Sequence, residues 1–143
     1  MSNAEQISEV LGPIFVGGEK DVDGELIDEM VGALRPLTDP DLTCVMSGAE
    51  HVELTYEGLD GLRRAWGDWL EAFARVRFEV IDVEQVGENV VTLARQIGTT
   101  RHGGVEIEQP SAAVWKFRDD NIVRIEFHLD RERAAESAGR PAE

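Results

Sequence analysis

The sequence predicts an α+β fold in which a curled antiparallel β-sheet forms a cone packed around N-terminal helices. Helical patterns come first, and the clearest of them directly precedes the main block of strands. Four long extended runs then follow one another with only short turn-like joints, which is typical of an antiparallel meander. Helices followed by strands favour a sheet covered by helices on one face. A chain of 143 residues has the size of one compact domain, so we expect a single domain over residues 1–143.

Two helices are expected near the N-terminus. The first covers residues 4–11, where apolar side chains recur at helical spacing, and Pro13 limits it. A polar, glycine-rich loop follows. The second helix covers residues 26–34, with Asp23 or one of its neighbours as its cap and Pro36 at its end.

The next segment is expected to form a turn and two short strands. Residues 38–41 combine Thr, Asp and Pro in a pattern typical of a turn. Short strands are predicted over residues 42–46 and 52–56, on either side of Ser47 and Gly48.

The clearest helix covers residues 59–73, because its large apolar side chains share one face and its charged side chains lie opposite. That face should pack on the strands predicted at residues 76–86, 89–101, 105–117 and 121–129. Asp130 can cap a last short helix over residues 131–138, which Gly139 ends. A strongly bent sheet holding helices in its concavity leaves an open mouth, and such a mouth is a natural site for a small molecule.

The chain is strongly acidic, and the acidity is concentrated near its N-terminus. Twenty-nine Asp and Glu residues against fourteen Lys and Arg give a formal net charge of −15. This charge works against binding to nucleic acid or to an anionic membrane, so neither partner is expected. Residues 1–57 carry thirteen acidic and two basic residues, and residues 58–143 are only mildly acidic. If the acidic segment edges the mouth of the cone, cationic or neutral ligands are favoured over anionic ones.

Cysteine usage and hydropathy predict a soluble, cytoplasmic protein. Cys44 is the single cysteine, so no internal disulfide forms, and we expect a small buried apolar side chain there. One thiol and three scattered histidines give no zinc-ligand spacing, so no metal site is expected. No stretch approaches the roughly 20 apolar residues of a membrane span. The first residues lack the pattern of a signal peptide.

Four segments carry a resemblance to one known group of proteins. They are a loop-to-helix entry (YEGLDGLR, residues 56–63), an aromatic-rich helix (WGDWLEAF, residues 66–73), a last hairpin (residues 113–126) and a closing segment (residues 129–136). In these segments the sequence resembles the SnoaL-like families of the nuclear transport factor 2-like superfamily. The resemblance covers residues 55–139 and implies the cone fold.

The resemblance leaves the reaction open. This fold hosts polyketide cyclases, ketosteroid isomerase, dehydratases, epoxide hydrolases and many non-enzymatic members, so a function has to be argued from the site. Members usually begin with one long helix that helps to wall the pocket. Here Pro13 and the Gly17-Gly18 loop break that region into two pieces, so the shape of the mouth should differ.

His128 and Asp130 are the candidate acid–base residues. Histidine is the side chain that titrates closest to neutral pH, and His128 lies on the last predicted strand. Asp130 is two residues further on, about 6.6 Å away at Cα on the same strand face, where a carboxylate can orient the ring. The resemblance implies that an acidic residue near the end of this strand moves a proton next to a carbonyl without metal or cofactor. Asp130 most nearly fits that position.

A structural role is the alternative for both residues. The apolar face of the last strand consists of Val123, Ile125, Phe127 and Leu129. Simple alternation then sends Arg124, Glu126, His128 and Asp130 to solvent or to a subunit interface. Asp130 can serve only as a helix cap, whereas a bulge near the mouth can re-aim either side chain into the pocket.

Tyr56 and the three tryptophans are further candidates. Tyr56, the only tyrosine, precedes the long helix, where its phenol could donate a hydrogen bond to a developing oxyanion, as in ketosteroid isomerase. The alternative is a packed ring with its hydroxyl in water. Trp66, Trp69 and Trp115 are typical of a core, although one of them could form a pocket wall against a flat apolar ligand.

Arg95 is the one charge within the apolar run of residues 90–97. We expect it to pair with a carboxylate such as Glu126 on a neighbouring strand; the alternative is contact with an anionic substrate. Both are therefore counted as candidate ligand-binding residues. His51 and His102 are expected in loops and in solvent.

Two hypotheses follow from these residues. In the first, a SnoaL-like domain binds a small, apolar or carbonyl-bearing organic molecule, with His128, Asp130 and Tyr56 as acid–base and polarising groups. In the second, the domain is a module without catalysis whose exposed sheet face forms a homodimer and whose pocket is plugged by aliphatic and Trp side chains. Neither hypothesis requires a cofactor.

Overall fold

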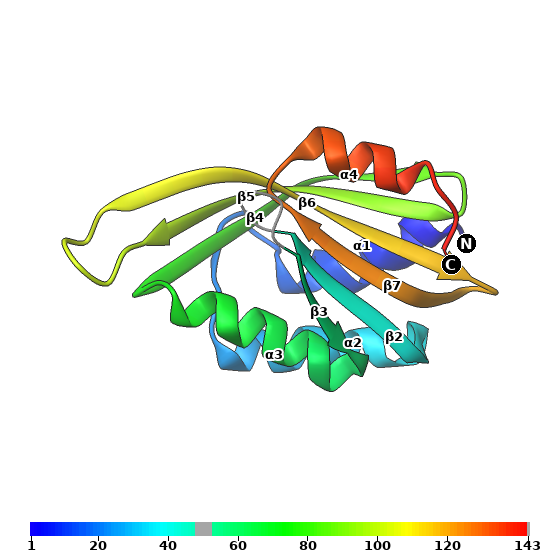
Figure 1. Cartoon of the computed structure of the whole chain (residues 1–143), viewed down its shortest axis with the longest axis horizontal. Coiled ribbons are helices and arrows are strands. Elements are labelled where there is room, and N and C mark those ends of the chain that lie inside the picture. Colours follow the sequence, from blue (N-terminus) through cyan, green and yellow to red (C-terminus); the bar gives the residue numbers. More distant parts are fainter. Residues whose placement is uncertain (48–52, 143) are drawn as a thin grey trace.

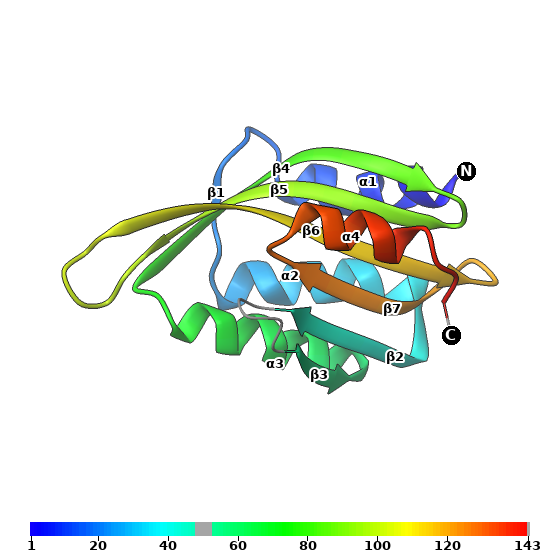
Figure 2. The same cartoon turned by 45° about the horizontal axis from the view of Figure 1, so that its top comes forward.

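The computed structural model describes residues 1–47 and 53–142 (Figures 1 and 2). Its helices are α1 (Asn3–Ile14), α2 (Gly24–Leu34), α3 (Gly58–Glu71) and α4 (Arg131–Ala138), with a 3-10 turn over Arg35–Leu37. Its strands are β1 (Lys20–Asp21), β2 (Thr38–Ser47), β3 (Glu53–Glu57), β4 (Arg75–Val86), β5 (Asn89–Thr99), β6 (Glu106–Arg118) and β7 (Asn121–His128). None of the described helices is long and apolar enough to span a membrane.

The strands form one curled sheet in the order β1-β4-β5-β6-β7-β2-β3. Helices α1, α2 and α3 lie on one side of this sheet, and α4 lies on the other, as the two views of the ribbon show (Figures 1 and 2). The predicted α+β class is confirmed. The predicted meander is confirmed as well, because β4, β5, β6 and β7 each pair antiparallel with the next strand.

The parallel pairing of β2 with β7 is the part of the topology that the sequence did not predict. It joins the acidic N-terminal part of the chain to the end of the meander. A parallel pair needs a long crossover connection, so its partners are far apart in sequence and no short turn signal marks them.

Two predictions for the N-terminal part are wrong in extent. Residues 38–41 belong to β2 and do not form the predicted turn. The register of β2 against β7 shifts between Thr38 and Thr43, and this irregularity accommodates Pro40, which has no backbone N–H to donate. Helix α1 continues through Pro13, because a proline in the last turn removes only one hydrogen bond and the Phe15 N–H still bonds the carbonyl of Leu11. Of the predicted strand over residues 52–56, Val52 lies outside the described residues, as does Gly48.

The predicted helix caps at Asp23 and Asp130 are confirmed. The Asp23 carboxylate accepts a hydrogen bond from the N–H of Leu26 at 2.8 Å. Helix α1 begins with a capping box that was not predicted from the sequence. The side-chain oxygens of Ser2 and Glu5 each accept a hydrogen bond from the backbone N–H of the other residue.

Alternation divides β5, β6 and β7 into two buried faces. Inner-face residues such as Ile125 and Trp115 pack against α1, α2 and α3 in the main core. Outer-face residues such as Val91 and Val114 pack against α4, where Ala134 is fully buried. The outer face is therefore partly covered within the chain itself.

A loop between α1 and α2 crosses β4 and is fixed there by ion pairs. Glu19 binds Arg77 at 2.7 Å and Arg95 at 2.9 Å, and β1 pairs with β4. Phe15 and Val22, at the two ends of this loop, are therefore held over the inner face of the sheet.

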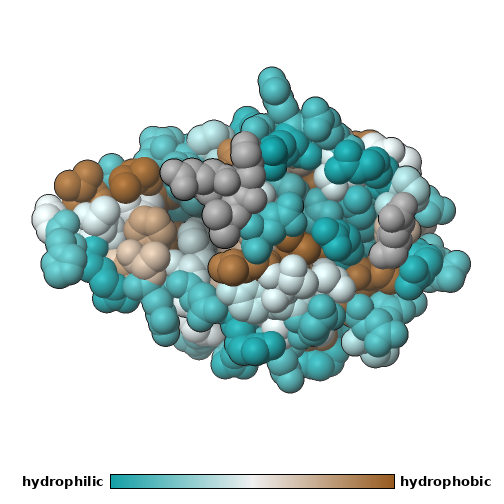
Figure 3. All heavy atoms as spheres, in the orientation of Figure 1, coloured by the Kyte–Doolittle hydropathy of each residue, from teal (hydrophilic) through white to brown (hydrophobic). Residues whose placement is uncertain are grey.

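The molecular face seen in Figure 3 is mainly hydrophilic, with apolar side chains gathered at one end over the β5–β6 turn. Val105 and Ile107 are exposed there. Homodimer formation through the sheet stays a prediction, and α4 already occupies part of the face it would use.

Candidate functional site

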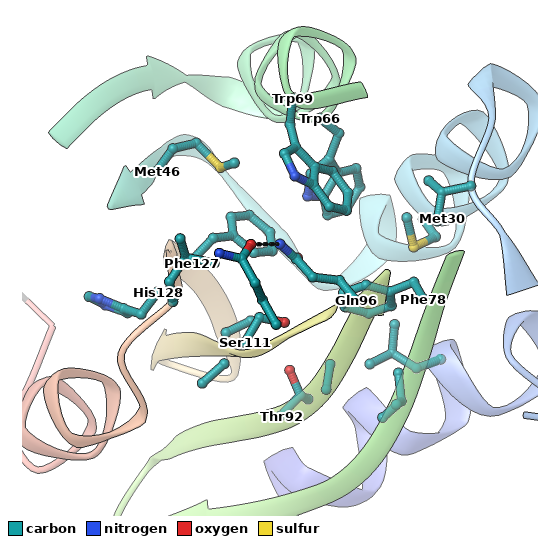
Figure 4. Close-up of a pocket in the computed structure, with 18 of the residues that line it drawn as sticks. Met30, Met46, Trp66, Trp69, Phe78, Thr92, Gln96, Ser111, Phe127 and His128 are labelled. Carbon is teal, nitrogen blue, oxygen red and sulfur yellow. Dashed lines mark hydrogen bonds between the residues drawn. The ribbon is translucent and has the colours of Figure 1, made fainter. Parts of the chain in front are cut away.

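An apolar cavity of about 260 Å³ lies between the inner face of the sheet and helices α1, α2 and α3. From the helical side it is lined by Leu11, Phe15, Val22, Met30, Trp66 and Trp69. From the sheet it is lined by Met46, Phe78, Val80, Ala94, Ala113, Trp115 and Phe127, among others (Figure 4). Concave apolar sites with a few polar groups are the usual form of small-molecule pockets.

Aromatic rings form much of the wall. The ring of Trp66 meets that of Phe127 edge-on at 5.5 Å between centroids, and Trp69 meets Phe78 in the same way at 6.3 Å. All three predicted tryptophans line the cavity, and Trp115 donates its indole N–H to Oγ1 of Thr92 at 3.2 Å. Edge-to-face contacts of this kind hold these rings in a fixed arrangement in the wall.

One part of the cavity wall depends on a glycine. Phe73 follows α3 and lies against Gly98 of β5, where a Cβ atom would come within 2.6 Å of its ring. Because no real side chain tolerates such a contact, only glycine at this position leaves Phe73 in its place in the lining.

Charged side chains are absent from the cavity. Within residues 1–47 and 53–142, no Asp, Glu, Lys or Arg lines it. The acidic N-terminal part contributes apolar lining residues, while its acids Glu19 and Asp21 pair with arginines of β4 and β5. The acidic charge of the N-terminal part therefore lies outside the described cavity wall.

The polar side chains that face the cavity come mainly from β5 and β6. Gln96 and Gln109 are cross-strand neighbours, and Nε2 of Gln96 donates to Oε1 of Gln109 at 3.3 Å. Ser111 lies two residues along β6 on the same face and also lines the cavity.

His128 belongs to a buried charged cluster on the outer face of the sheet, beneath α4. Its Nε2 lies 2.8 Å from Oε1 of Glu126, which also accepts a hydrogen bond from Oγ of Ser137 at 2.6 Å. Oε2 of Glu126 accepts from Nε of Arg124 at 2.6 Å and lies 3.8 Å from Nζ of Lys116. We call these five residues the Glu126 cluster. Although His128 touches the cavity, its ring points away from it (Figure 4).

The Glu126 carboxylate stays ionised in this setting. Burial acts to raise its pKa, but the hydrogen bonds from His128, Ser137 and Arg124, with the charge of Lys116, hold the pKa well below the usual range of a glutamate. Nδ1 of His128 is buried and has no hydrogen-bond partner in the described part of the chain.

Asp130 lies outside the cavity and is exposed. Its Oδ1 accepts hydrogen bonds from the N–H groups of Glu132 and Arg133, at 2.9 and 3.3 Å. The side chain therefore caps α4, whereas His128 is turned toward Glu126.

Replacing Asp130 by alanine should lower the free energy of unfolding by about 1 kcal/mol, because the first turn of α4 loses its cap. Chemical denaturation measures this loss. Asp130→Ser, which keeps a capping oxygen, should stay close to the wild type, and neither variant should change ligand affinity. An affinity that falls in Asp130→Ala alone would contradict a purely structural role.

Tyr56 is partly buried near the end of β3, two residues before α3, and it does not line the cavity. Its hydroxyl donates a hydrogen bond to Oδ2 of Asp68 at 3.0 Å. Partial desolvation and the Asp68 carboxylate raise the pKa of the Tyr56 phenol. The structure thus separates Tyr56, His128 and Asp130, each with its own partners.

Arg95 does pair with carboxylates, but the predicted partner Glu126 is not among them. It binds Glu108 at 2.8 Å and Glu19 at 2.9 Å, with Glu79 at 3.5 Å. Arg95 lies on β5 and Glu126 on β7, with β6 between them. Arg95 pairs instead with Glu19, in the loop before α2, and with Glu79 and Glu108 on the two strands beside β5.

Three further predictions concern isolated residues. Cys44 is fully buried, and burial raises the pKa of its thiol to about 12, so the prediction of a small buried side chain is confirmed. His102 is exposed in the turn between β5 and β6, as predicted. His51 lies outside the described residues.

Among the described residues, no group of three potential ligands is placed to hold a metal ion.

Gln96 and Gln109 were not predicted from the sequence as residues of the site. The available signal was alternation: both glutamines fall at inward positions of strands whose other inward residues are small or apolar. The pair itself depends on the register of β5 against β6, which alternation within each strand does not specify.

The fold and the site together define the chain's class. A curled sheet wrapped around three helices, with an apolar cavity between them, is the α+β cone of the nuclear transport factor 2-like proteins. The profile of the SnoaL-like domain matches residues 27–125, and the chain belongs to this family. The resemblance found in the sequence is therefore confirmed.

Several solved structures have folds similar to that of this chain. A protein from Jannaschia sp. CCS1, assigned as a SnoaL-like polyketide cyclase, is 18% identical with a TM-score of 0.64 and covers 96% of this chain and 94% of its own. An NTF2-like protein of unknown function from Burkholderia pseudomallei K96243 is 19% identical with a TM-score of 0.63, at 96% and 95% coverage. TerC, co-crystallised with polyporic acid, is 17% identical with a TM-score of 0.60, at 96% and 98% coverage. No curated protein matches the chain.

Proposed function

We propose that this protein binds an uncharged, largely apolar small organic molecule in the cavity between the sheet and α1–α3. The observation that carries the proposal is the lining itself: aromatic and aliphatic side chains with a few amides and hydroxyls, and no charged group pointing inward from the described residues. TerC, a protein of similar fold, was co-crystallised with polyporic acid, which supports a small molecule as the class of ligand.

Binding is favoured over acid–base catalysis by the placement of the candidate catalytic groups. Asp130 caps α4, Tyr56 donates to Asp68, and the ring of His128 faces the Glu126 cluster. An acid–base reaction needs a titratable group within hydrogen-bond reach of the substrate. The cyclase-type chemistry of SnoaL-like relatives would require His128 to turn into the cavity and leave Glu126.

A matched pair of ligands tests the proposal. Fluorene should bind at least tenfold more tightly than fluorene-2-carboxylate, because burying a carboxylate without a cationic partner costs several kcal/mol. Calorimetric titration, supported by quenching of Trp66 and Trp69 fluorescence, measures both affinities. Equal affinity, or a preference for the carboxylate, would overturn the assignment of an uncharged ligand.

A further inference from the structure

The cavity contains a pair of inward-facing amides that can recognise a ligand oxygen. Among its other polar lining residues, Thr92 accepts a hydrogen bond from Trp115 and keeps its own O–H donor, and the His128 ring points away. Ser47 is the register partner of His128 on β2 and shares its outward face. The inward polar groups that are left are the paired amides of Gln96 and Gln109, with the hydroxyl of Ser111 beside them.

This amide pair faces the cavity from the sheet. Gln96 is only 8% exposed and Gln109 is half-buried, and the hydrogen bond between them lies on the side of the sheet that faces Trp66 and Trp69 (Figure 4). A flat ligand that packs against the two indoles would therefore have an edge near the amides.

The pair leaves hydrogen-bonding groups unused. One N–H of Gln96 and the carbonyl of Gln109 satisfy each other, and no other hydrogen bond of either side-chain amide occurs in the described part of the chain. The NH₂ group of Gln109 and the carbonyl of Gln96 remain. Rotating both amides would exchange the two residues' roles, but one NH₂ group and one carbonyl would still be free.

Unused amide groups in an apolar surrounding are costly unless a partner supplies their hydrogen bonds. An uncharged oxygen fits them, because a ketone accepts from the NH₂ group and a hydroxyl can also donate to the carbonyl. A carboxylate does not fit, since no Lys or Arg of the described lining accompanies the amides.

We infer that the Gln96–Gln109 pair is the specificity-determining element of the cavity and that the ligand is a flat aromatic molecule bearing a ketone or hydroxyl oxygen. This inference rests on the proposed function and adds the recognition of that oxygen. Gln96 and Gln109 thereby act in binding through hydrogen bonds, and Trp66 and Trp69 through ring contacts.

The test uses two probes of nearly the same shape, fluorene and 9-fluorenone, which differ by one ketone oxygen. Wild-type protein should bind 9-fluorenone five- to tenfold more tightly, as expected for one hydrogen bond. The double variant Gln96→Leu/Gln109→Leu removes both amides together and should bind the two probes equally. The control Gln6→Leu makes the same change in α1, outside this cavity, and should keep the preference.

A second measurement does not depend on the folding of any variant. In the wild type, the side-chain NH₂ resonances of Gln96 or Gln109 should shift with 9-fluorenone by more than with fluorene. If fluorene binds but the ketone brings neither tighter binding nor a larger shift, the amide inference is wrong and the proposed function stands. If neither probe binds, the proposed function fails and the inference fails with it.

Discussion

Replacing Glu126 by alanine is expected to lower the free energy of unfolding by about 3–5 kcal/mol. The loss should be large because the variant leaves the buried Lys116, together with Arg124 and His128, without the carboxylate that they surround. Uncompensated buried charge is among the few mechanisms that give effects of this size. Denaturant titration of the purified variant gives the value directly.

Glu84→Ala is the matched control, because Glu84 is an exposed glutamate on β4. It should change stability by no more than about 0.5 kcal/mol. Combining Glu126→Leu with Lys116→Met should recover part of the loss, since two apolar side chains leave fewer unpaired charges. A loss below about 1 kcal/mol in Glu126→Ala would mean that the Glu126 cluster adds little to the fold.

The same carboxylate gives a pH dependence of known sign. The pKa of Glu126 is lower in the folded chain than in the unfolded chain, so its contribution is fully present above about pH 5 and is lost as the pH falls further. Wild-type stability should therefore fall more steeply between about pH 5 and pH 3 than that of Glu126→Gln, which cannot titrate there. Parallel slopes in the two proteins would contradict this account.

Replacing Ala94 by leucine should weaken the binding of any cavity ligand by at least about a hundredfold. Ala94 is 2% exposed on the inner face of β5, opposite Ser111, and lines the cavity. Three added carbon atoms would occupy space that the ligand needs, and overlap with a bound molecule in a rigid wall is not relieved by small shifts.

Stability should change little in the same variant, because the new side chain enters a cavity and buries apolar surface of its own. Ala74→Leu makes the same change at an exposed alanine before β4 and serves as the control for both measurements. Fluorene affinity measured by calorimetry, together with the thermal midpoint of each variant, separates a blocked cavity from a damaged fold. Unchanged affinity in a folded Ala94→Leu protein would place the ligand elsewhere.

Local patterns predicted the elements of this fold well. The helix that carries Trp66 and Trp69, the four strands of the meander and the cap at Asp130 all follow from spacing and turn chemistry within a few residues. The parallel β2–β7 pair and the inclusion of Pro40 in a strand depend on contacts between distant segments, which no local pattern contains.

The candidate site was predicted less completely, for a related physical reason. Alternation along β7 correctly put Glu126 and His128 on the face opposite Phe127, but the pattern does not show that α4 returns to bury them. The pair of Gln96 and Gln109 exists only in one register of β5 and β6. The ion pair of Arg95 with Glu19 likewise could not be predicted, because it depends on the path of the loop before α2.

The two buried faces of β7 also limit how the strand can align during folding. A shift of β7 by one residue would turn Glu126 and His128 into the apolar cavity and bring Phe127 beneath α4. Each misaligned pairing would then place charged groups among the tryptophans, away from Lys116 and Ser137. The Glu126 cluster thus penalises slipped alignments against both β2 and β6, and it helps the chain to reach a single pairing.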